Sequence, residues 1–459
     1  MQSRRRPGLT RTAIIATTIL LGATAVILPP RQVAARAAAA TSAANVPMYR
    51  GSAAGNLEVT TGENLAVQWS SPPLAALALD AIPYGNTLFI GGMVFSPAFV
   101  AKHAPGVDPF YALDVRTGAV RWQATTPNWH SRGPAIVNGT VYLGVGNSWA
   151  RSAFPINWDT VTRGTGTSGV YAYDAATGKP LWTFNTPGAV HNTPLYHDGV
   201  VYAATGDRAF YAIDAKTGAQ LWKLSIPSYD SVSSPILVGN LVYFGGAHPY
   251  AVYAVDIATH KLVWQTALPD VIGATDDCTP AVANGLVYIE GAPNPPGKTY
   301  TALPSTGTPV GQKLFALDAR TGKIAWSFGE GLGHTPFFYA ASTPTVVGGA
   351  VYFGSDVTAS FYAVDAKTGV QRWVYHVGAW SLPTTIGESG TVHDGIVWTG
   401  TRGGVLLGLR ATDGAVAYKK QLKAAIYAGS PAVVDNTLIV PSSTGHILAF
   451  SIPQLLHGH

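Results

Sequence analysis

Cysteine is almost absent from this sequence of 459 residues, in which Cys278 is the single one. No disulfide can form within the chain, so the fold must be stable without one. The C-x-x-C-H signature is missing too, which excludes covalently attached haem. No cysteine lies near the apolar N-terminal run, which argues against a lipid-anchored lipoprotein. Cys278 itself stands alone in DDCTP, and we expect a small buried side chain there.

Charged residues are also scarce, at 12% of the chain, and acidic ones are missing from its N-terminus. Residues 1–44 contain six arginines and no acid. Without them, 23 of the 29 basic side chains remain against 24 acidic ones, a net charge near −1. The pI of about 9.1 therefore reflects the N-terminus. A nearly neutral body has no basic field to attract nucleic acid, so no nucleic-acid partner is expected.

Long helical patterns are the third absence. No 3.6-residue apolar period persists after the N-terminal run, whereas 51 glycines and 32 prolines punctuate short apolar segments. Four to six apolar or alternating residues, followed by turn residues, are typical of short antiparallel strands. The sequence therefore predicts an all-β fold.

The N-terminus has the parts of an export signal. A basic stretch, MQSRRRPGLTR, precedes the apolar run of residues 13–28, and small residues with A-x-A cleavage points follow between about 35 and 44. The 16-residue run is shorter than the roughly 20 residues that span a bilayer. We expect residues 1–44 to be an export segment that is removed, with an uncleaved anchor as the alternative. Residues 45–459 are then a single periplasmic, cell-wall-associated or extracellular domain without an integral membrane part.

One phrase, D-x-x-T-G-x-x-x-W with small departures, recurs along the rest of the chain. A seventh copy has Arg410 in place of the aspartate and Tyr418 in place of the tryptophan, and HILAFSIP is an eighth fragment. The spacing of 40–47 residues, with two longer intervals of 60 and 62, is typical of propeller blades. The six complete copies contain Asp114 and Trp122, Asp174 and Trp182, Asp214 and Trp222, Asp256 and Trp264, Asp318 and Trp326, and Asp365 and Trp373.

The constant spacing within the phrase predicts a structural role. The aspartate and threonine can bond backbone N–H groups and close the turn between the third and fourth strands of a blade. Glycine allows the positive φ that such a turn needs. The tryptophan, eight residues after the aspartate, is large enough to fill the gap between adjacent twisted sheets.

The two ends of the chain complement each other. The C-terminus supplies three strand-like segments without a fourth, and the segment NLAVQWSS at the N-terminus carries Trp69 at the missing tryptophan position. Pairing them would close a ring and remove two exposed sheet edges. We therefore predict an eight-bladed β-propeller of four-stranded antiparallel blades, closed by an N-terminal strand that pairs with the C-terminal blade.

On these residues the chain resembles the PQQ-repeat β-propellers, from about residue 60 to 452. The clearest departures are His260, in place of glycine, and Arg410. The family contains quinoprotein dehydrogenases, which bind pyrroloquinoline quinone and calcium. It also contains the β-barrel assembly lipoprotein B, a non-enzymatic scaffold. The repeat therefore does not decide between a catalytic and a binding function.

Longer connections between strands two and three, and between one blade and the next, should lie over one mouth of the channel. This loop-rich face is the expected ligand or protein site, although its rings could equally pack the loops on each other. Its aromatic members are Trp129, Trp149, Trp158, Tyr229, Phe337, Phe338, Tyr339, Trp380 and Tyr427. Its polar members are His130, Asn147, His191, Asp230, Asp276, Asp277, Asn294 and His334.

The resemblance to quinoprotein dehydrogenases implies specific site residues. Their G-x-G-N-P loop is matched by GVGNS, with Asn147, and less closely by GAPNPP, with Asn294. Trp380 is the candidate for stacking on the cofactor. Asp276 and Asp277 are candidate calcium ligands, or one of them a base. The enzymes' H-D-x-W-D segment and adjacent cysteine pair are missing.

These features favour an exported, non-catalytic propeller that binds a protein or a small molecule at its loop-rich face, as a monomer. A dehydrogenase that uses the quinone and calcium to oxidise an alcohol or sugar is the alternative. A carbohydrate-binding surface, suggested by Trp158 and Trp380, is a third possibility.

Overall fold

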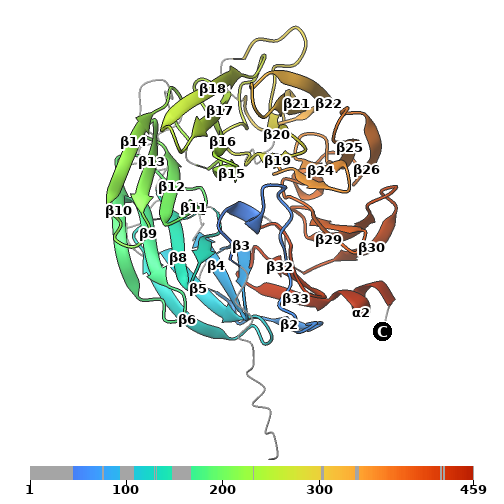
Figure 1. Cartoon of the computed structure of the whole chain (residues 1–459). Coiled ribbons are helices and arrows are strands. Elements are labelled where there is room, and N and C mark those ends of the chain that lie inside the picture. Colours follow the sequence, from blue (N-terminus) through green and yellow to red (C-terminus); the bar gives the residue numbers. More distant parts are fainter. Residues whose placement is uncertain are drawn as a thin grey trace, which may run out of the picture. The chain divides into compact units, whose positions relative to one another are not determined.

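Eight small sheets form a ring in the computed structural model of the chain (Figure 1). The structure describes residues 45–74, 77–93, 108–128, 130, 132–146, 167–230, 232–300, 304–335, 341–423, 426 and 429–457. These residues all belong to one compact unit, Thr41–His459. The expected export segment lies outside the described residues. None of the helices in the described ranges has both the length and the apolar character needed to cross a lipid bilayer.

Seven blades are four-stranded, antiparallel and continuous in sequence. The first four are blade 1, β3 (Leu77–Tyr84), β4 (Thr87–Met93), β5 (Asp108–Asp114) and β6 (Val120–Thr126); blade 2, β7 (Ala135–Val137), β8 (Thr140–Val145), β9 (Ser168–Asp174) and β10 (Pro180–Thr186); blade 3, β11 (Leu195–His197), β12 (Val200–Thr205), β13 (Ala209–Asp214) and β14 (Gln220–Ser225); and blade 4, β15 (Ile236–Val238), β16 (Leu241–Gly246), β17 (Ala251–Asp256) and β18 (Lys261–Ala267).

The remaining blades complete the ring, and two short helical elements lie in connections. Blade 5 has β19 (Ala281–Ala283), β20 (Leu286–Gly291), β21 (Pro309–Asp318) and β22 (Ile324–His334); blade 6 has β23 (Thr345–Val347), β24 (Ala350–Ser355), β25 (Ser360–Asp365) and β26 (Gln371–His376); blade 7 has β27 (Thr391–His393), β28 (Ile396–Gly400), β29 (Val405–Arg410) and β30 (Val416–Gln421). The helical elements are η1 (Tyr49–Gly51) and η2 (Leu382–Thr384).

Blade 8 joins the two ends of the chain, as predicted. Its strands are β31 (Ala432–Val434), β32 (Thr437–Pro441) and β33 (Ile447–Ser451), followed by α2 (Ile452–His457). The N-terminal strand β2 (Trp69–Ser70) pairs antiparallel with β33, with Trp69 opposite Ala449. One strand was not foreseen: β1 (Glu58–Val59) pairs parallel with β31 and makes this sheet five-stranded.

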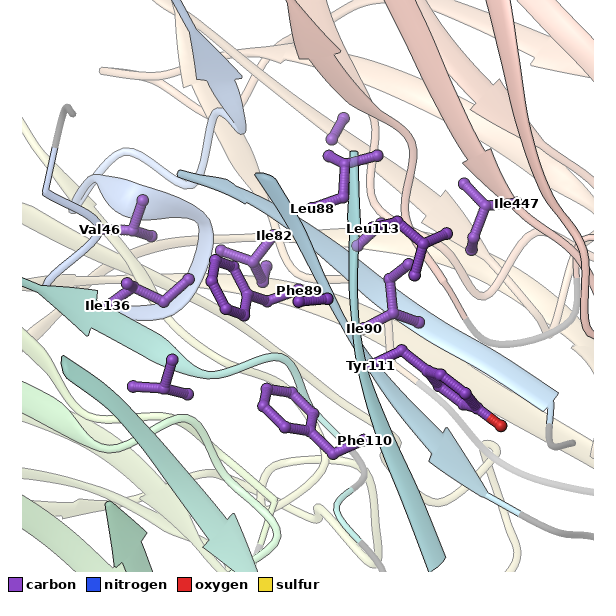
Figure 2. Close-up of a cluster of buried hydrophobic side chains, with 14 of the residues drawn as sticks. Val46, Ile82, Leu88, Phe89, Ile90, Phe110, Tyr111, Leu113, Ile136 and Ile447 are labelled. Atoms are coloured by element: carbon purple, nitrogen blue, oxygen red, sulfur yellow. The ribbon is translucent and has the colours of Figure 1, made fainter. Parts of the chain in front are cut away.

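The burial of each strand explains its composition. Second and third strands, such as β12 and β13, are buried on both faces, which accounts for continuous apolar runs such as FYAI. Fourth strands, such as β14, alternate between exposed and half-buried residues because one face contacts the next blade and the other faces solvent. Figure 2 shows the apolar cluster between blades 8, 1 and 2, in which Phe89 and Phe110 stack with ring centroids 6.3 Å apart.

The repeated turn has the geometry that its residues predict. In blade 3, Asp214 Oδ1 accepts hydrogen bonds from the backbone N–H and the hydroxyl of Thr217, each at 2.7 Å. Gly218 has φ +74° and packs on the Trp182 ring, where a Cβ would lie 2.8 Å from ring atoms. The same ring donates its Nε1–H to Ala215 O at 3.0 Å. Glycine is thus needed both for its φ and for the close approach of the indole.

The two departures from the repeat have local replacements. His260 adopts φ +57° and stacks on Trp222, with ring centroids 4.6 Å apart. In blade 7, Arg410 forms an ion pair with Asp413, and Asp413 Oδ1 accepts the N–H of Ala415 at 3.0 Å. Asp413 thereby takes over the turn-closing role of the missing aspartate.

The N-terminal segment runs inside the ring, next to the first strands of the blades (Figure 1). Val46 exchanges two backbone hydrogen bonds with Ile136 in blade 2, and its neighbour Pro47 accepts the N–H of Tyr196 in blade 3. Ala53 and Ala54 accept N–H groups from blades 5 and 6, and Leu57 accepts that of Val433 in blade 8. Residues 45–59 therefore satisfy backbone donors on the first strands of five blades, which a propeller without this segment would expose to its channel.

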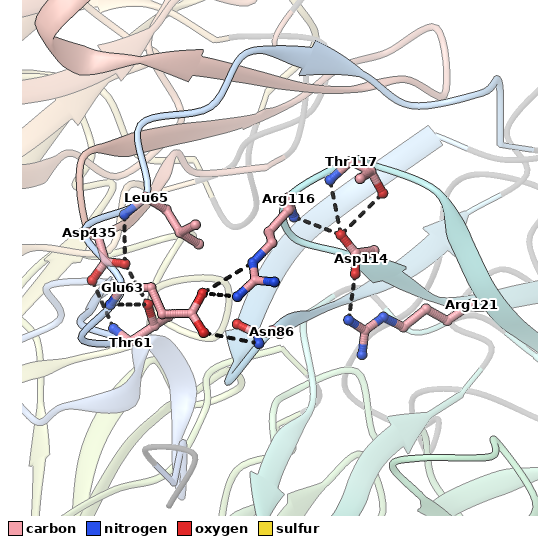
Figure 3. A network of polar contacts seen from close by, with 9 residues as sticks. All are labelled: Thr61, Glu63, Leu65, Asn86, Asp114, Arg116, Thr117, Arg121 and Asp435. Atoms are coloured by element: carbon pink, nitrogen blue, oxygen red, sulfur yellow. Dashed lines mark hydrogen bonds and ion pairs between the residues drawn. The ribbon is translucent and has the colours of Figure 1, made fainter. Parts of the chain in front are cut away.

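A polar network fixes the chain after this segment on the face opposite the long connections (Figure 3). Asp435 accepts the backbone N–H groups of Thr61 and Leu65 at 2.8 and 3.1 Å. Glu63 forms an ion pair with Arg116 in the turn of blade 1. The network thus connects blade 8, the N-terminal segment and blade 1.

We expect Trp69→Ala to lower the free energy of unfolding by about 3 kcal/mol, because it removes a large ring from the contact between blades 8 and 1. The Nε1–H···O bond to Val115, 3.0 Å long, is lost as well. Hydrogen exchange measured by mass spectrometry should accelerate in β2 and β33. Trp182→Ala, within a continuous blade, is the control and should leave β2 and β33 protected. Equal protection of these strands in both variants would contradict the closure role.

Candidate functional site

The long connections gather on one side of the ring, which we call the loop face. Strands alternate in direction within a blade, so the connection between its second and third strands and the connection to the next blade leave on the same side. Asp276 and Asp277 lie between β18 and β19, Asn294 between β20 and β21, and Trp380 between β26 and β27. All four residues therefore belong to the loop face. Asn147, Trp129, Trp149, Trp158, Phe337, Phe338, Tyr339 and Tyr427 lie outside the described residues.

Asn294 and Trp380 are engaged in local contacts. Asn294 Oδ1 accepts the N–H of Tyr300 at 2.7 Å, and its Nδ2 donates to Tyr300 O at 3.3 Å. The indole of Trp380 donates to Asp356 O at 3.1 Å, and its ring lies 4.8 Å from that of His334. The amide of Asn294 thus holds its own loop together.

The segment Asp276–Cys278 lies in the interior of the protein. Asp276 is buried, and Cys278 is fully buried as expected. Cys278 Sγ accepts the backbone N–H of Glu290 at 3.4 Å. Burial raises the pKa of this thiol well above its ordinary value, so it is a poor nucleophile.

A group of charged side chains, which we call the arginine cluster, converges on the axis of the ring beneath the loop face. Arg132, in the connection between β6 and β7, donates from Nη2 to Asp277 O at 2.7 Å and from Nη1 to the Tyr49 hydroxyl at 3.4 Å. Asp80 from β3 and Glu388 from the connection before β27 interact electrostatically with the same guanidinium. These residues come from the N-terminal segment, blade 1 and three connections between blades, and only the closed ring brings them together.

Arg50 adds a second buried guanidinium to this cluster. Its Nε donates to Gly55 O at 2.5 Å, and its Nη2 donates to Gly390 O at 2.9 Å and to Thr391 Oγ1 at 2.6 Å. Its Nη1, and Nε of Arg132, have no hydrogen-bond partner among the described residues. Buried donors are nearly always satisfied, so these two N–H groups are suited to a ligand that accepts hydrogen bonds.

Burial and neighbouring charges shift the pKa values in the arginine cluster. Burial raises the pKa of Tyr49 to about 12, although the positive charge of Arg132 opposes it. For Arg132, burial lowers the pKa, but electrostatic interactions with Tyr49, Asp80 and Glu388 together outweigh it, so the pKa is raised. Burial raises the pKa of Glu388 to about 7, against the opposing charge of Arg402. Glu388 therefore changes charge near neutral pH.

Sequence reasoning did not find Arg132, Arg50, Asp80 or Glu388. Each is a single polar residue in a segment without a motif, and they lie up to 338 positions apart in the chain. Two further buried acids had a weak signal: Glu290 interrupts the apolar strand LVYIEG, and Glu330 lies in the glycine-rich stretch GEGLG. An acid within an otherwise apolar strand is unusual enough to mark a site.

The residues predicted to bind quinone and calcium make other contacts or lie outside the described part of the chain. The described residues contain no group of three or more His, Cys, Asp or Glu side chains placed to hold a metal ion. Asn294 uses its amide on Tyr300, and Asn147 lies outside the described residues. The assignment of Asn147, Asn294, Trp380, Asp276 and Asp277 to a quinone and calcium site therefore stays a prediction.

The fold and its repeats define the class of protein, an eight-bladed β-propeller with PQQ-like repeats. The chain belongs to the family described as outer membrane protein assembly factor BamB, whose sequence profile matches residues 111–291, 246–381 and 362–454. This membership confirms the resemblance to PQQ-repeat propellers.

Three relatives of established name differ in how much of the chain they match. Tetrathionate hydrolase from Acidithiobacillus ferrooxidans is 26% identical over 418 residues, 85% of this chain and 81% of the relative. BamB from Yersinia pestis is 25% identical over 293 residues, 61% of this chain and 66% of the relative. A quinohemoprotein alcohol dehydrogenase from Pseudomonas putida is 29% identical over 151 residues, but only 31% of this chain and 19% of the relative.

A solved structure has the same fold. The crystal structure of BamB from Moraxella catarrhalis superposes with a TM-score of 0.57 and 17% sequence identity, covering 84% of this chain and 100% of that chain. At this identity the likeness concerns the fold alone.

We expect Glu388→Gln to flatten the pH dependence of stability between pH 4.5 and 7. The ordinary pKa of Glu388 is 4.5 and its folded value about 7, so in this window the folded state holds a proton that the unfolded state has lost. The free energy of unfolding must therefore fall as the pH rises, by on the order of 3 kcal/mol for this group. Urea unfolding from pH 4 to 9 measures the slope.

The control for this measurement is Asp198→Asn, because the Asp198 side chain is 89% exposed on the opposite face. It should reproduce the wild-type slope. Equal slopes for Glu388→Gln and the wild type would contradict a proton held on Glu388.

Proposed function

We propose that this chain hydrolyses a sulfur oxoanion of the tetrathionate class at the arginine cluster. The observation that carries the proposal is the match to tetrathionate hydrolase along most of both chains, whereas the quinohemoprotein match covers less than a third of this one. The geometry supports it independently, because Arg50 Nη1 and Arg132 Nε are buried donors without partners among the described residues. Guanidinium groups suit the oxygens of a sulfonate as they suit those of a carboxylate or phosphate.

The proposed reaction needs only water as the second substrate. The water oxygen bonds to the sulfur of one sulfonate group, and the S–S bond to the neighbouring sulfur breaks. The electron pair leaves with the three-sulfur fragment, so the products are sulfate, a trisulfur oxoanion and two protons. No oxidant or reductant is required.

The residues of the site have distinct proposed roles. Arg132 and Arg50 bind the substrate and stabilise negative charge that develops on the attacked sulfonate. Asp276 or Asp277 takes the proton from water as general base. Glu388, which holds a proton below about pH 7, donates it to the leaving sulfur.

A second candidate is the exported, non-catalytic scaffold favoured by the sequence. Its support is the BamB family profile, which matches the chain from residue 111 to 454, and the BamB relative. In that case the loop face would bind a protein, and deletion of the gene would lower the amount of assembled outer-membrane proteins. Either function would operate outside the cytoplasm if residues 1–44 act as the predicted export segment.

Purified protein incubated with tetrathionate from pH 3 to 8 should release one sulfate per substrate, measured by ion chromatography. Arg132→Gln should lower kcat/KM at least ~100-fold, because it removes a charge that meets the substrate. Asp276→Asn or Asp277→Asn should lower kcat by about 10²-fold or more, whichever is the base. Asp198→Asn is the matched control and should retain full activity.

Absence of sulfate release at every pH would refute the hydrolase. An unchanged kcat/KM in Arg132→Gln would refute the assignment of the site. Pyrroloquinoline quinone and calcium are added in parallel: a bound-cofactor spectrum with dye reduction by alcohols or sugars would instead favour the dehydrogenase.

A further inference from the structure

Blade 5 contains three buried polar side chains on adjacent strands. Glu290 lies on β20 and is fully buried, Gln312 lies on β21, and Glu330 lies on β22 with 7% of its surface exposed. The proposed hydrolytic step uses neither glutamate. Their positions within a sheet that is otherwise apolar at this level call for a physical explanation.

A β-bulge places Glu330 in this group. Gln312 pairs with Gly331 and Lys313 pairs with Gly329, so Glu330 is the extra residue of β22. Gly331 has φ +100°, which the bulge requires and which glycine adopts readily. Bulges redirect a side chain and interrupt the ladder, and they are frequent near functional sites. Here the bulge turns a residue of the outermost strand toward the interior.

Hydrogen bonds fix the glutamine between the two acids but leave the acids incompletely satisfied. Gln312 Nε2 donates to Glu290 Oε2 at 2.5 Å, and Ser355 Oγ donates to Gln312 Oε1 at 3.0 Å. Glu290 Oε1 is buried without a hydrogen-bond partner in the described part of the chain. The Ser355 hydroxyl, which donates to Gln312, is also close enough to Glu330 to favour its ionised form.

The described groups around the two glutamates form no ion pair with either of them. Asp356, from the turn between β24 and β25, is a third acid near Glu290, and it forms a bidentate ion pair with Arg402 from blade 7. Cys278 Sγ accepts the backbone N–H of Glu290, and the Tyr362 hydroxyl donates to the backbone oxygen of Glu330 at 2.9 Å. No salt bridge from a described residue reaches either glutamate.

Ionising both carboxyl groups in this buried environment costs more free energy than ionising one of them. Burial, and then the charge of Glu330, raise the pKa of Glu290 well above its ordinary value, and burial raises the pKa of Glu330 to about 8. A proton on one carboxyl removes the repulsion and gives the other a donor. The pair then titrates as a unit.

We propose that Glu290 and Glu330 share one proton at neutral pH, and that loss of this proton lowers the affinity of the arginine cluster for anions. The inference rests on the proposed function, since it concerns the anion that the arginine cluster would bind. Glu290 is connected to the cluster by its hydrogen bond to Cys278, the residue after Asp277. An added negative charge in this poorly solvated region opposes a dianion over several ångströms. The two glutamates do not contact the anion. They change its affinity through their charge.

Infrared spectroscopy tests the shared proton without any substrate. The wild-type protein at pH 7 should show the C=O band of a protonated, buried carboxylic acid. Glu290→Gln and Glu330→Gln should each move its midpoint to lower pH, because the repelling neighbour is gone. The double variant should keep only the part of the band that belongs to Glu388, which Glu388→Gln removes. Glu63→Gln, at an exposed ion pair on the opposite face, is the matched control. A missing band in the wild type, or an unchanged band in the double variant, overturns the shared proton.

Calorimetric titration with thiosulfate, a dianion with the same oxygen chemistry, tests the effect on affinity. Because Glu388 also titrates near pH 7, the reference is Glu388→Gln. Its Kd should rise about tenfold or more between pH 6 and 9, whereas the triple variant that adds Glu290→Gln and Glu330→Gln should show a flat profile. A pH-independent Kd in Glu388→Gln, or an unchanged pH dependence in the triple variant, overturns the control of affinity.

Two further outcomes separate this inference from the proposed function. Failure of thiosulfate to bind at any pH would overturn the anion site and the control of affinity, while the infrared result would still decide the shared proton. A rise in Tm on adding calcium that the double variant lacks would overturn the shared proton by assigning a cation to the pair.

Discussion

Ring closure at blade 8 is the constraint on which the site depends. The strand that carries Trp69 completes the C-terminal sheet, and β1 adds a parallel strand on its other side. Residues 45–59, which begin the described chain and end with β1, run along the first strands inside the ring. Closure therefore does two things at once: it removes the open sheet edges, and it places Tyr49 and Arg50 on the axis.

The charges on this axis are tolerated because the N-terminal segment, blade 1 and three connections between blades contribute them to a shared network. Arg132 comes from the connection after blade 1, Asp80 from β3 and Glu388 from the connection after blade 6. Burial alone would disfavour every one of them, and opposite charges at the centre of the ring offset that cost. Arg50 Nη1 and Arg132 Nε stay unpaired among the residues that the structure describes, and they are the reason to propose an anion there.

The propeller frame is common to proteins of different function, so the frame cannot choose among them. The relatives include a hydrolase, an assembly factor and a quinohemoprotein dehydrogenase. The function of this chain is therefore a question about Arg132, the Asp276–Asp277 pair and the acids of blade 5, all of which lie outside the repeated phrase.

The sequence by itself determined the frame: eight blades, their turns and the pairing of Trp69 with the C-terminal blade follow from local patterns of period two and from a phrase repeated every 40–47 residues. It also pointed to the loop face and to Asp276 and Asp277. Only the tertiary structure brought Arg50, Asp80, Arg132 and Glu388 together, and only the bulge at Glu330 aligned that acid with Glu290. These residues meet through ring closure and register, which act across hundreds of positions and leave no periodic trace in the chain.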